Sequence, residues 1–252
     1  MSNHRFLAAT LTSTLALLFH INALAQTVDR CSPFKESNSL RKQSSKKEKL
    51  SLAPSAEDKA AFAKYLNGSQ TGLIHLIPRI LYENKLNISG GGAYYSFDCL
   101  TYEYGYGSDI ELQTPIIIVD RTYVPPTIAD YKFVTGFAGA DYGFIVRLGD
   151  VPIEEVTLKN DGMKFLVDYR PAASETRARV EQRRSRDGIE INGYEYARIA
   201  PVIVNQTYAL RSINYEASDV LVAFRVVREE SNGSVVIVWK MLKRFLPPAL
   251  VR

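Results

Sequence analysis

The sequence predicts an α+β protein that is predominantly antiparallel β, arranged as a sandwich or a strongly curved sheet with one N-terminal helix and one short Arg-rich helix. Three observations support this fold class. The 15 Tyr and 11 Phe residues, together with many Val and Ile, favour strands. Turn residues separate short segments of alternating polarity about every 8–12 positions. The longest alternating run, residues 207–245, has the pattern of three adjacent strands.

The clearest hairpin signal in the chain is the dipeptide Asn232-Gly233. A type I′ turn needs positive φ at both central residues, and Asn-Gly tolerates this well. A two-residue loop at this position pairs Val226 with Trp239 and places both on one apolar face with Phe224. We therefore expect Trp239 to be buried in the core of the sheet.

Residues 1–25 have the features of a signal peptide. Arg5 supplies a positive charge, Phe6–Ile21 is apolar, and Ala23-Leu24-Ala25 fits an A-x-A cleavage site. An uncleaved N-terminal anchor is the alternative. No later segment is apolar enough to span a bilayer, so we expect no transmembrane segment after signal removal and a secreted or periplasmic protein.

Two regions follow the predicted signal peptide. Residues 26–53 are expected to form a flexible basic tail, because they are rich in Ser and Lys and carry few apolar side chains. Residues 54–252 are expected to form a single β-rich domain, since this length is sufficient for one hydrophobic core. The Arg-rich segment could divide two subdomains, but one continuous core is the preferred interpretation.

The first helix of this domain is predicted over Ser55–Leu66. Ser55 can cap the helix, with Asp58 at the capping-box position, and Asn67-Gly68 can end it. Thr71–Ile77 is short and apolar, so its pattern fits either a helix or a strand. Ser174–Arg186 is polar and is expected to form a surface helix capped by Ser174 or an ordered linker.

Most of the remaining chain is predicted to be β. Two hairpins are expected, one with its turn at Gly139-Ala140-Asp141 and one with its turn at Asn160-Asp161-Gly162. The expected strands are Ala93–Tyr104, Ile110–Val119, Lys132–Phe137, Tyr142–Leu148, Val151–Leu158, Met163–Val167, Ile189–Ile191, Tyr194–Ala197, Pro201–Val204 and Tyr208–Tyr215.

Composition argues against several classes of function. The formal net charge is +4 at pH 7, which is too small to indicate nucleic-acid binding. Of the three His residues, only His75 lies outside the predicted signal peptide, so a zinc site built from several imidazoles is excluded. Gly90-Gly91-Gly92 lacks the spacing of a phosphate-binding loop and is expected to be a turn. We therefore expect no metal and no cofactor.

The two cysteines, Cys31 and Cys99, can oxidise if the chain is exported. An intrachain disulfide would tie the predicted tail to the strand near Cys99. The alternative is a buried Cys99 with Cys31 free or paired between molecules, because the sequence does not give the Cα distance that a disulfide requires.

The segment Tyr94–Glu111 is the richest candidate for a binding site. Tyr102, Tyr104 and Tyr106 share one parity, so an unbroken strand would present their phenol rings on one face. Asp109 and Glu111 follow on one face as well. Such a row suits stacking against a glycan or a peptide.

Two alternatives accompany this candidate binding site. In the first, the tyrosines line the rim of a sandwich and the acids face water, while Gly105 and Gly107 bend the strand. In the second, carboxylates around Asp98, Asp109 and Glu111 form the acid pair of a hydrolase. Separately, the Arg170–Arg186 segment fits either a site for phosphates or an acidic partner, or a solvated helix face.

Two segments, GGGAYYSFDCLTYEYGYGSDIEL and YALRSINYEASDVLVAFRVVREESNGSVVIVWKMLKRF, resemble stretches of an uncharacterised group of secreted bacterial proteins with no known activity. The resemblance covers much of the chain from about Ser55 onward and implies export in a bacterium. With the composition, it leads us to expect an exported, non-catalytic binding or structural protein of the bacterial cell envelope or exterior. A secreted hydrolase is the alternative.

Overall fold

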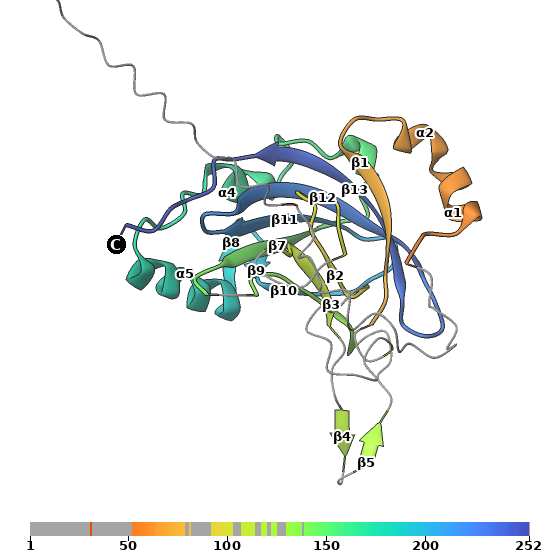
Figure 1. Cartoon of the computed structure of the whole chain (residues 1–252), viewed down its shortest axis with the longest axis horizontal. Helices are drawn as coiled ribbons and strands as arrows, with labels where there is room; N and C mark the ends of the chain where they lie inside the picture. The colour runs from red at the N-terminus through yellow and green to blue at the C-terminus, as the bar shows by residue number, and fades with distance from the viewer. Residues whose placement is uncertain are drawn as a thin grey trace, which may run out of the picture.

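The computed structural model describes Cys31 and residues 52–78, 81, 92–102, 107–113, 117–119, 122–124, 130–137 and 139–251. The predicted signal peptide and almost all of the predicted tail lie outside the described residues. Within them, the chain forms antiparallel sheets flanked by short helices, which confirms the predicted fold class (Figure 1). Among the described residues, no helix is both long and apolar enough to cross a membrane.

A strongly curved seven-stranded sheet dominates the described structure. Its strand order is β1-β13-β12-β11-β7-β9-β8, and all neighbouring strands are antiparallel. Its strands are β1 (Thr71–Leu76), β13 (Val235–Arg244), β12 (Ser218–Glu229), β11 (Thr207–Asn214), β7 (Tyr142–Gly149), β9 (Tyr194–Ala197) and β8 (Ile189–Ile191).

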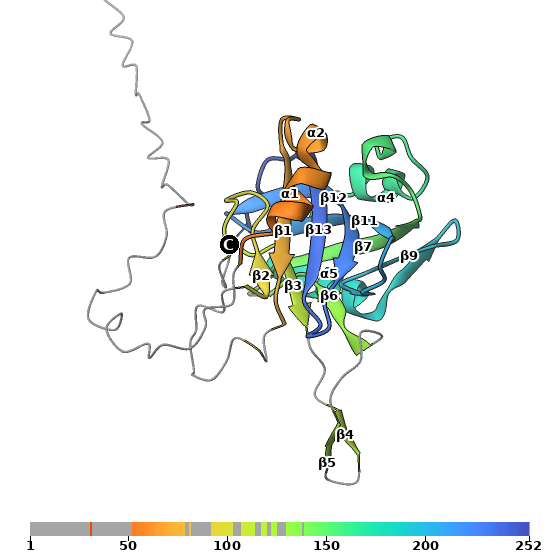
Figure 2. The same ribbon diagram turned by 90° about the vertical axis from the view of Figure 1, so that its right-hand side faces the viewer.

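A smaller four-stranded sheet packs against one face of the curved sheet. Its order is β10-β6-β3-β2, with β10 (Ile199–Pro201), β6 (Lys132–Val134), β3 (Ile110–Gln113) and β2 (Tyr94–Tyr95). Arg198 alone separates β9 from β10, so the chain changes sheets at this residue. A separate hairpin, β4 (Ile117–Val119) with β5 (Thr122–Val124), extends away from both sheets (Figures 1 and 2).

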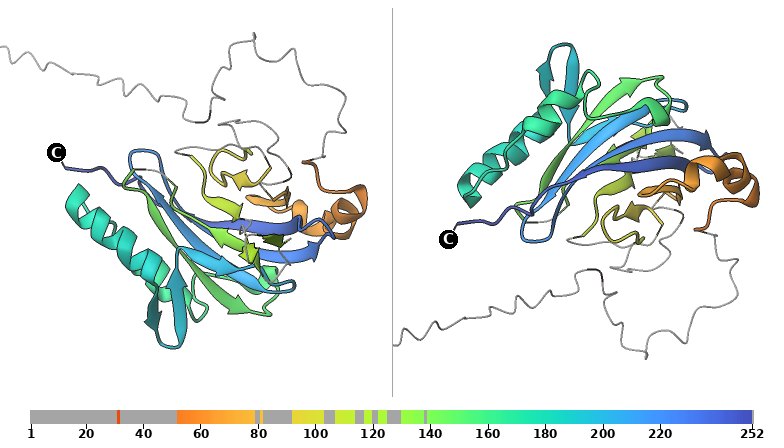
Figure 3. Two further views of the ribbon diagram at one scale, coloured as in Figure 1. Left: turned by 90° about the horizontal axis from the view of Figure 1, so that it is seen from below. Right: turned by 90° about the horizontal axis from the view of Figure 1, so that it is seen from above.

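The helices cover the opposite face of the seven-stranded sheet (Figure 3). One part of this face, around β7, β9 and β11, is covered by α4 (Met163–Asp168) and α5 (Glu175–Asp187). Nearer β1, it is covered by α1 (Ala56–Ala61), α2 (Ala63–Leu66) and the 3₁₀ helix η2 (Ile153–Glu155). The curved sheet is therefore buried on both faces, which explains why β11 is buried along its whole length.

Trp239 lies in the core between the two sheets, as predicted. Its side chain is only 3% exposed, and its indole packs edge-on against Phe97 at 5.3 Å between ring centres. Gly72 stands opposite Trp239 in the β1–β13 pair. A Cβ at Gly72 would come within 2.5 Å of the indole ring, so glycine is needed there for the ring to lie across β1.

The predicted pairing of Val226 with Trp239 is wrong by two residues. Phe224 pairs with Trp239, because three residues rather than two separate the hydrogen-bonded pair Glu230 and Ser234, and a bulge between Val226 and Arg228 shifts the register once more. Gly233 has φ +84°, and its N–H donates to the Glu230 carbonyl, as expected for a three-residue hairpin rather than a type I′ turn. From Val222 to Val226 the shift is two, an even number, so Phe224, Val226 and Trp239 keep their predicted face.

The predicted capping of the first helix is confirmed. The Ser55 side chain accepts a hydrogen bond from the Asp58 N–H, and the Asp58 carboxylate accepts one from the Ser55 N–H. The predicted single helix is interrupted at Phe62, so α1 and α2 are separate. Thr71–Ile77, left open between helix and strand, forms strand β1.

Several strand predictions are wrong in instructive ways. Ala93–Tyr104 is not one strand, because β2 ends at Tyr95 and the chain turns back so that Ser96 bridges to Thr101. The predicted strand Ile110–Val119 contains two strands, β3 and β4, which belong to different sheets. The predicted strand Pro201–Val204 shares only Pro201 with the observed strand β10. Lys132–Phe137 and Tyr142–Leu148 contain β6 and β7, but these strands belong to different sheets.

The predicted hairpin around Asn160-Asp161-Gly162 is also wrong. Met163–Asp168 is helical, and Val151–Leu158 contains only the short helix η2. In contrast, the β8–β9 strands are confirmed, and their turn at Asn192-Gly193 has positive φ at both residues. Ser174–Arg186 forms a helix, α5, rather than a linker, although the Ser174 side chain makes no capping hydrogen bond.

Candidate functional site

The acids predicted to lie in an exposed binding site are buried. Asp109 is 0% exposed and Glu111 is 7% exposed. Asp109 lies directly before β3, and Glu111 lies within β3, where it pairs with Tyr94 and Val134 of the four-stranded sheet. Neither carboxylate is therefore available on an outer surface for stacking partners.

Asp109 is the acceptor at the centre of a buried polar network. Its Oδ2 accepts the Phe97 N–H at 2.7 Å, and its Oδ1 accepts the Asn214 side-chain amide at 3.3 Å. The same amide donates to Ser218 at 3.0 Å. Because β3 and β11 belong to different sheets, this network joins the two sheets through side-chain hydrogen bonds.

Burial raises the pKa of Asp109 to about 6, against the opposing effect of hydrogen bonds from Ser212 and the Phe97 N–H. A carboxyl group with this pKa is partly protonated just below neutral pH. Its neighbours are hydrogen-bonding groups of the fold, and it opens onto neither of the two pockets described below. The network is consistent with a structural role for Asp109.

Of the three predicted site tyrosines, only Tyr102 is among the described residues; Tyr104 and Tyr106 lie outside them. The Tyr102 hydroxyl accepts the His75 N–H at 3.0 Å and donates to the Leu52 carbonyl at 3.1 Å. Its ring packs edge-on against Tyr95. Tyr102 therefore connects β1, the four-stranded sheet and Leu52.

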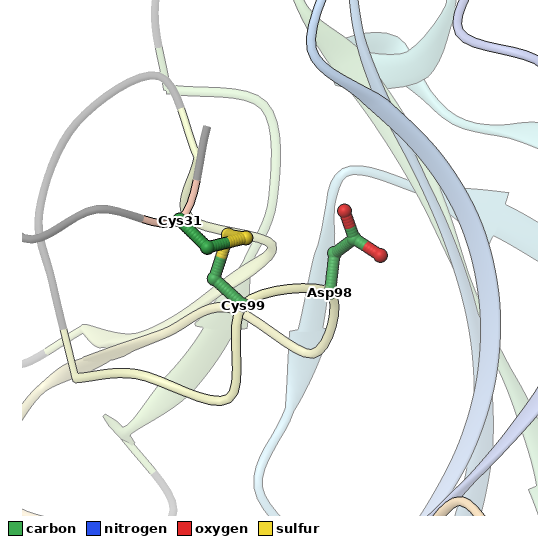
Figure 4. Close-up of side chains that lie close together, drawn as sticks. All are labelled: Cys31, Asp98 and Cys99. Carbon is green, nitrogen blue, oxygen red and sulfur yellow. A yellow bond between two sulfur atoms is a disulfide. The ribbon is translucent and has the colours of Figure 1, made fainter. Parts of the chain in front are cut away.

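Cys31 and Cys99 form a disulfide with a Cα–Cα distance of 5.1 Å, as one of the two alternatives predicted (Figure 4). The Asp98 carboxylate lies within 4.8 Å of both sulfur atoms. Bonded sulfurs offer no thiolate, so these three groups do not make a metal site. Asp98 instead accepts a hydrogen bond from Arg244 Nε at 2.9 Å.

A pocket lies beside α5 on the described surface, and we call it the α5 groove. It has a volume of about 860 Å³ and lies between Tyr169–Ser174 and the outer side of α5. Val251 also lines the groove, and its N–H donates to the Ala173 carbonyl. The C-terminal end of the chain lies near α5 (Figure 3). Its lining residues are Tyr169, Arg170, Pro171, Ala172, Ala173, Ser174, Arg177, Val180, Glu181, Arg184 and Val251.

A buried arginine holds the floor of the α5 groove in place. Arg211 Nη1 donates to the carbonyls of Leu166 and Tyr169 at 2.6 and 2.8 Å, which caps the C-terminal end of α4. The same guanidinium forms a two-bond ion pair with Asp219 and lies under the Phe245 ring at 3.7 Å. Arg211 is only 1% exposed, so this arrangement fixes the chain where it enters the groove.

Hydroxyl groups meet beneath the groove. The Tyr169 hydroxyl hydrogen-bonds both the Tyr142 hydroxyl at 2.9 Å and Glu181 Oε2 at 2.7 Å. The Tyr215 hydroxyl donates to the Ala172 carbonyl at 2.7 Å. Burial is the main cause that raises the pKa of Tyr142, Tyr169 and Tyr215, so these phenols stay neutral and act as hydrogen-bonding groups.

The exposed charges of the α5 groove are mainly positive. Arg170, Arg177 and Arg184 line it and are exposed, whereas Glu181 is the single acid in the lining. Glu181 is already bound by Tyr169 and lies 3.4 Å from Arg184. The apolar part of the lining includes Val180, which is 46% exposed.

Part of the groove's lining falls in the Arg170–Arg186 segment. The sequence left this segment open between a site for phosphates or an acidic partner and a solvated helix face. The contributions of Tyr169 and Val251 were missed, because they depend on long-range packing of α4 and the C-terminal segment against α5. The one local signal was Pro171, which marks the extended segment that forms the groove's other wall.

Comparison with protein-family models, with curated proteins and with solved structures found no match to this chain.

Proposed function

We propose that the protein is an exported, non-catalytic binding protein of the bacterial cell envelope or exterior, and that it holds an extended acidic peptide in the α5 groove. The observation that carries this proposal is the groove itself, about 860 Å³ in volume and bordered by three exposed arginines. This volume lies within the usual range for ligand pockets.

Charge and shape together favour an acidic peptide. Guanidinium groups bind carboxylates in a planar, two-bond geometry, which is stronger than a neutral hydrogen bond. The apolar surface of Pro171, Ala172 and Val180 suits the aliphatic and backbone parts of an extended chain. A neutral glycan would offer no carboxylate to these guanidinium groups.

Export is supported by the Cys31–Cys99 disulfide, since disulfides persist in oxidising compartments. Residues 1–25 fit a cleaved signal peptide. The test is to express the full chain in a bacterium and to determine the N-terminal residue and thiol content of the processed protein. We expect a chain that starts at Gln26 with no free thiol. A chain that keeps residues 1–25, or that contains two free thiols, contradicts export with cleavage.

The hydrolase alternative would need carboxylates that converge on a shared substrate. Asp98 is held by Arg244, Asp109 is buried in a hydrogen-bonded network, and Glu111 is buried in β3. No observation on the described residues favours this alternative over binding.

The peptide proposal is tested by selection from a random peptide library displayed on phage, with the oxidised protein as the immobilised target. We expect enrichment of sequences rich in Asp and Glu. Affinity of a selected, fluorescently labelled peptide is then measured by anisotropy at fixed ionic strength.

Charge reversal in the groove provides the control comparison. Arg177→Glu should weaken binding about tenfold or more, since it replaces a charge-assisted contact with repulsion. Arg183→Glu changes the same charge on the same helix outside the groove and should leave the affinity within about twofold. Equal losses in both variants would indicate non-specific attraction and contradict the assignment of the groove.

A further inference from the structure

A second, smaller pocket lies on the other side of α5 from the groove. It has a volume of about 280 Å³ and is lined mainly by polar groups from the last turns of α5, the β6–β7 connection and Arg198. It shares no lining residue with the α5 groove.

Arg198 enters this pocket because of the way the chain changes sheets. Its N–H donates to the Ser185 carbonyl of α5 at 2.8 Å, and its carbonyl accepts the Thr135 N–H at 3.0 Å. These two bonds fix Arg198 between the last turns of α5 and the end of β6. Thr135 and Arg198 are thereby held as neighbours in the lining of the pocket.

Two buried donors in this pocket have no hydrogen-bond partner among the described residues. Thr135 is 0% exposed, and its hydroxyl has no partner. Arg198 Nη2 donates to the Gly136 carbonyl at 3.1 Å, but its Nε–H has no partner. A buried donor without an acceptor is destabilising, so both positions would be stabilised by an acceptor bound in the pocket.

Positive charge predominates in the lining of this pocket. Arg179, Arg183, Arg186 and Arg198 line it, and Asp141 is the one carboxylate in the lining. The buried Glu111 of β3 also acts on Arg198 electrostatically. Asp141 is turned toward the Tyr215 N–H, which it accepts at 2.8 Å.

The arginines at the pocket differ in how fully they are engaged. Arg179 is occupied by Glu175 and by the Gly139 carbonyl, and Arg186 lies 3.0 Å from Asp187. Arg183 is exposed and has no ion-pair partner within the described ranges. The lining of the pocket thus offers the exposed guanidinium of Arg183 and two buried donors without acceptors.

We propose that this anion pocket, formed by Thr135, Arg183, Arg186 and Arg198, binds a tetrahedral oxyanion of the phosphate or sulfate class. One anion oxygen would accept from the Thr135 hydroxyl and from Arg198 Nε, and the outer oxygens would face Arg183 and Arg186. Four acceptor oxygens suit donors that converge from several directions, and guanidinium groups bind such oxyanions well.

The proposal is tested by titrating the full processed protein with inorganic phosphate and with sulfate, using isothermal calorimetry and thermal unfolding at fixed ionic strength with chloride as the balancing ion. We expect saturable binding of one anion per chain and a rise in melting temperature that follows its occupancy. If phosphate and sulfate at concentrations up to about 10 mM give neither binding heat nor a change in melting temperature, the proposal is overturned.

Three variants decide whether binding occurs in this pocket. Thr135→Val keeps the side-chain shape and removes the hydroxyl, so it should weaken phosphate binding about tenfold while leaving the anion-free melting temperature unchanged or higher. Arg183→Gln, on the surface, should weaken binding about threefold. Arg177→Gln lies on the groove side of the same helix and should have no effect.

Equal weakening by Arg183→Gln and Arg177→Gln would overturn the proposal, since it would show attraction to the whole helix. If Thr135→Val proves too unstable to assay, Arg183→Gln against Arg177→Gln still decides the question. A parallel titration with O-phosphoserine distinguishes the source of the anion. Binding equal to that of inorganic phosphate assigns the pocket to a phosphate ester, and much weaker binding assigns it to the free ion.

Discussion

Trp239 fills the space between the two sheets and touches residues from two other parts of the chain. Tyr95 of β2 and Phe97, two residues later, pack against it, and Gly72 lies beneath it in β1. The substitution Trp239→Ala should lower the free energy of unfolding by about 3–5 kcal/mol, because it leaves a cavity that the surrounding strands cannot close. Chemical denaturation measures this change.

Leu246→Ala is a suitable control for that substitution, because Leu246 is 91% exposed. It should change the free energy of unfolding by no more than about 0.5 kcal/mol. Similar small effects of both substitutions would contradict the assignment of Trp239 to the core.

Asp109 gives a prediction that depends on pH. Burial raises the pKa of its carboxyl to about 6, so the folded state binds the proton more tightly than the unfolded state. The resulting stabilisation is fully present below about pH 4, the unfolded value, and is lost as the pH rises through 6. Relative to wild type, Asp109→Asn should therefore gain up to about 3 kcal/mol between pH 4 and pH 7, since two pKa units correspond to this amount.

The measurement is urea unfolding of both proteins across this pH range. Asp161→Asn, at an exposed position, serves as the control and should run parallel to wild type. A constant difference between Asp109→Asn and wild type would contradict the raised pKa.

At the level of secondary-structure elements, α4 depends on a side chain from the neighbouring sheet. Arg211 caps the last carbonyls of α4 and neutralises the buried Asp219. Arg211→Met should cost about 3–5 kcal/mol, because it leaves both the helix end and a buried carboxylate without a partner. Adding Asp219→Asn should recover part of this loss.

Equilibrium unfolding of the single and double variants tests this role. A loss below about 1 kcal/mol for Arg211→Met, with no recovery in the double variant, would mean that α4 is held by packing alone.

Local patterns predicted the elements whose signals lie within a few residues. The capping box at Ser55, the β8–β9 turn and α5 each follow from short-range chemistry. Met163–Val167 was mistaken for a strand, because a short apolar run has the same pattern in either structure. The left-handed Gly162, which was interpreted as a hairpin turn, instead precedes the helix.

Long-range arrangement could not be derived in the same way. The assignment of β6 and β7 to different sheets, and the burial of Asp109, depend on contacts between distant residues. Asp109 was predicted to be exposed because acidic residues usually are. Its partner Asn214 lies 105 positions away, so no local pattern could reveal the bond.

For the whole molecule, the Cys31–Cys99 disulfide closes a long stretch of chain, with a sequence separation of 68. The loop-entropy relation gives about 4 kcal/mol for a loop of this length. Reduction, or the pair Cys31→Ser with Cys99→Ser, should therefore lower the free energy of unfolding by about 2–4 kcal/mol. Calorimetry with and without reductant measures this, and an unchanged melting temperature would contradict a stabilising role.

The proposed function also belongs to the whole molecule, since the groove combines α5, the segment after α4 and the C-terminal segment. Amide hydrogen exchange, measured with and without a selected acidic peptide, tests it most directly. We predict slower exchange in Tyr169–Ser174, α5 and the residues near Val251, with the rest of the described chain unchanged. Protection confined to another surface, such as the four-stranded sheet, would contradict the central claim that α5 and its neighbours form the binding site.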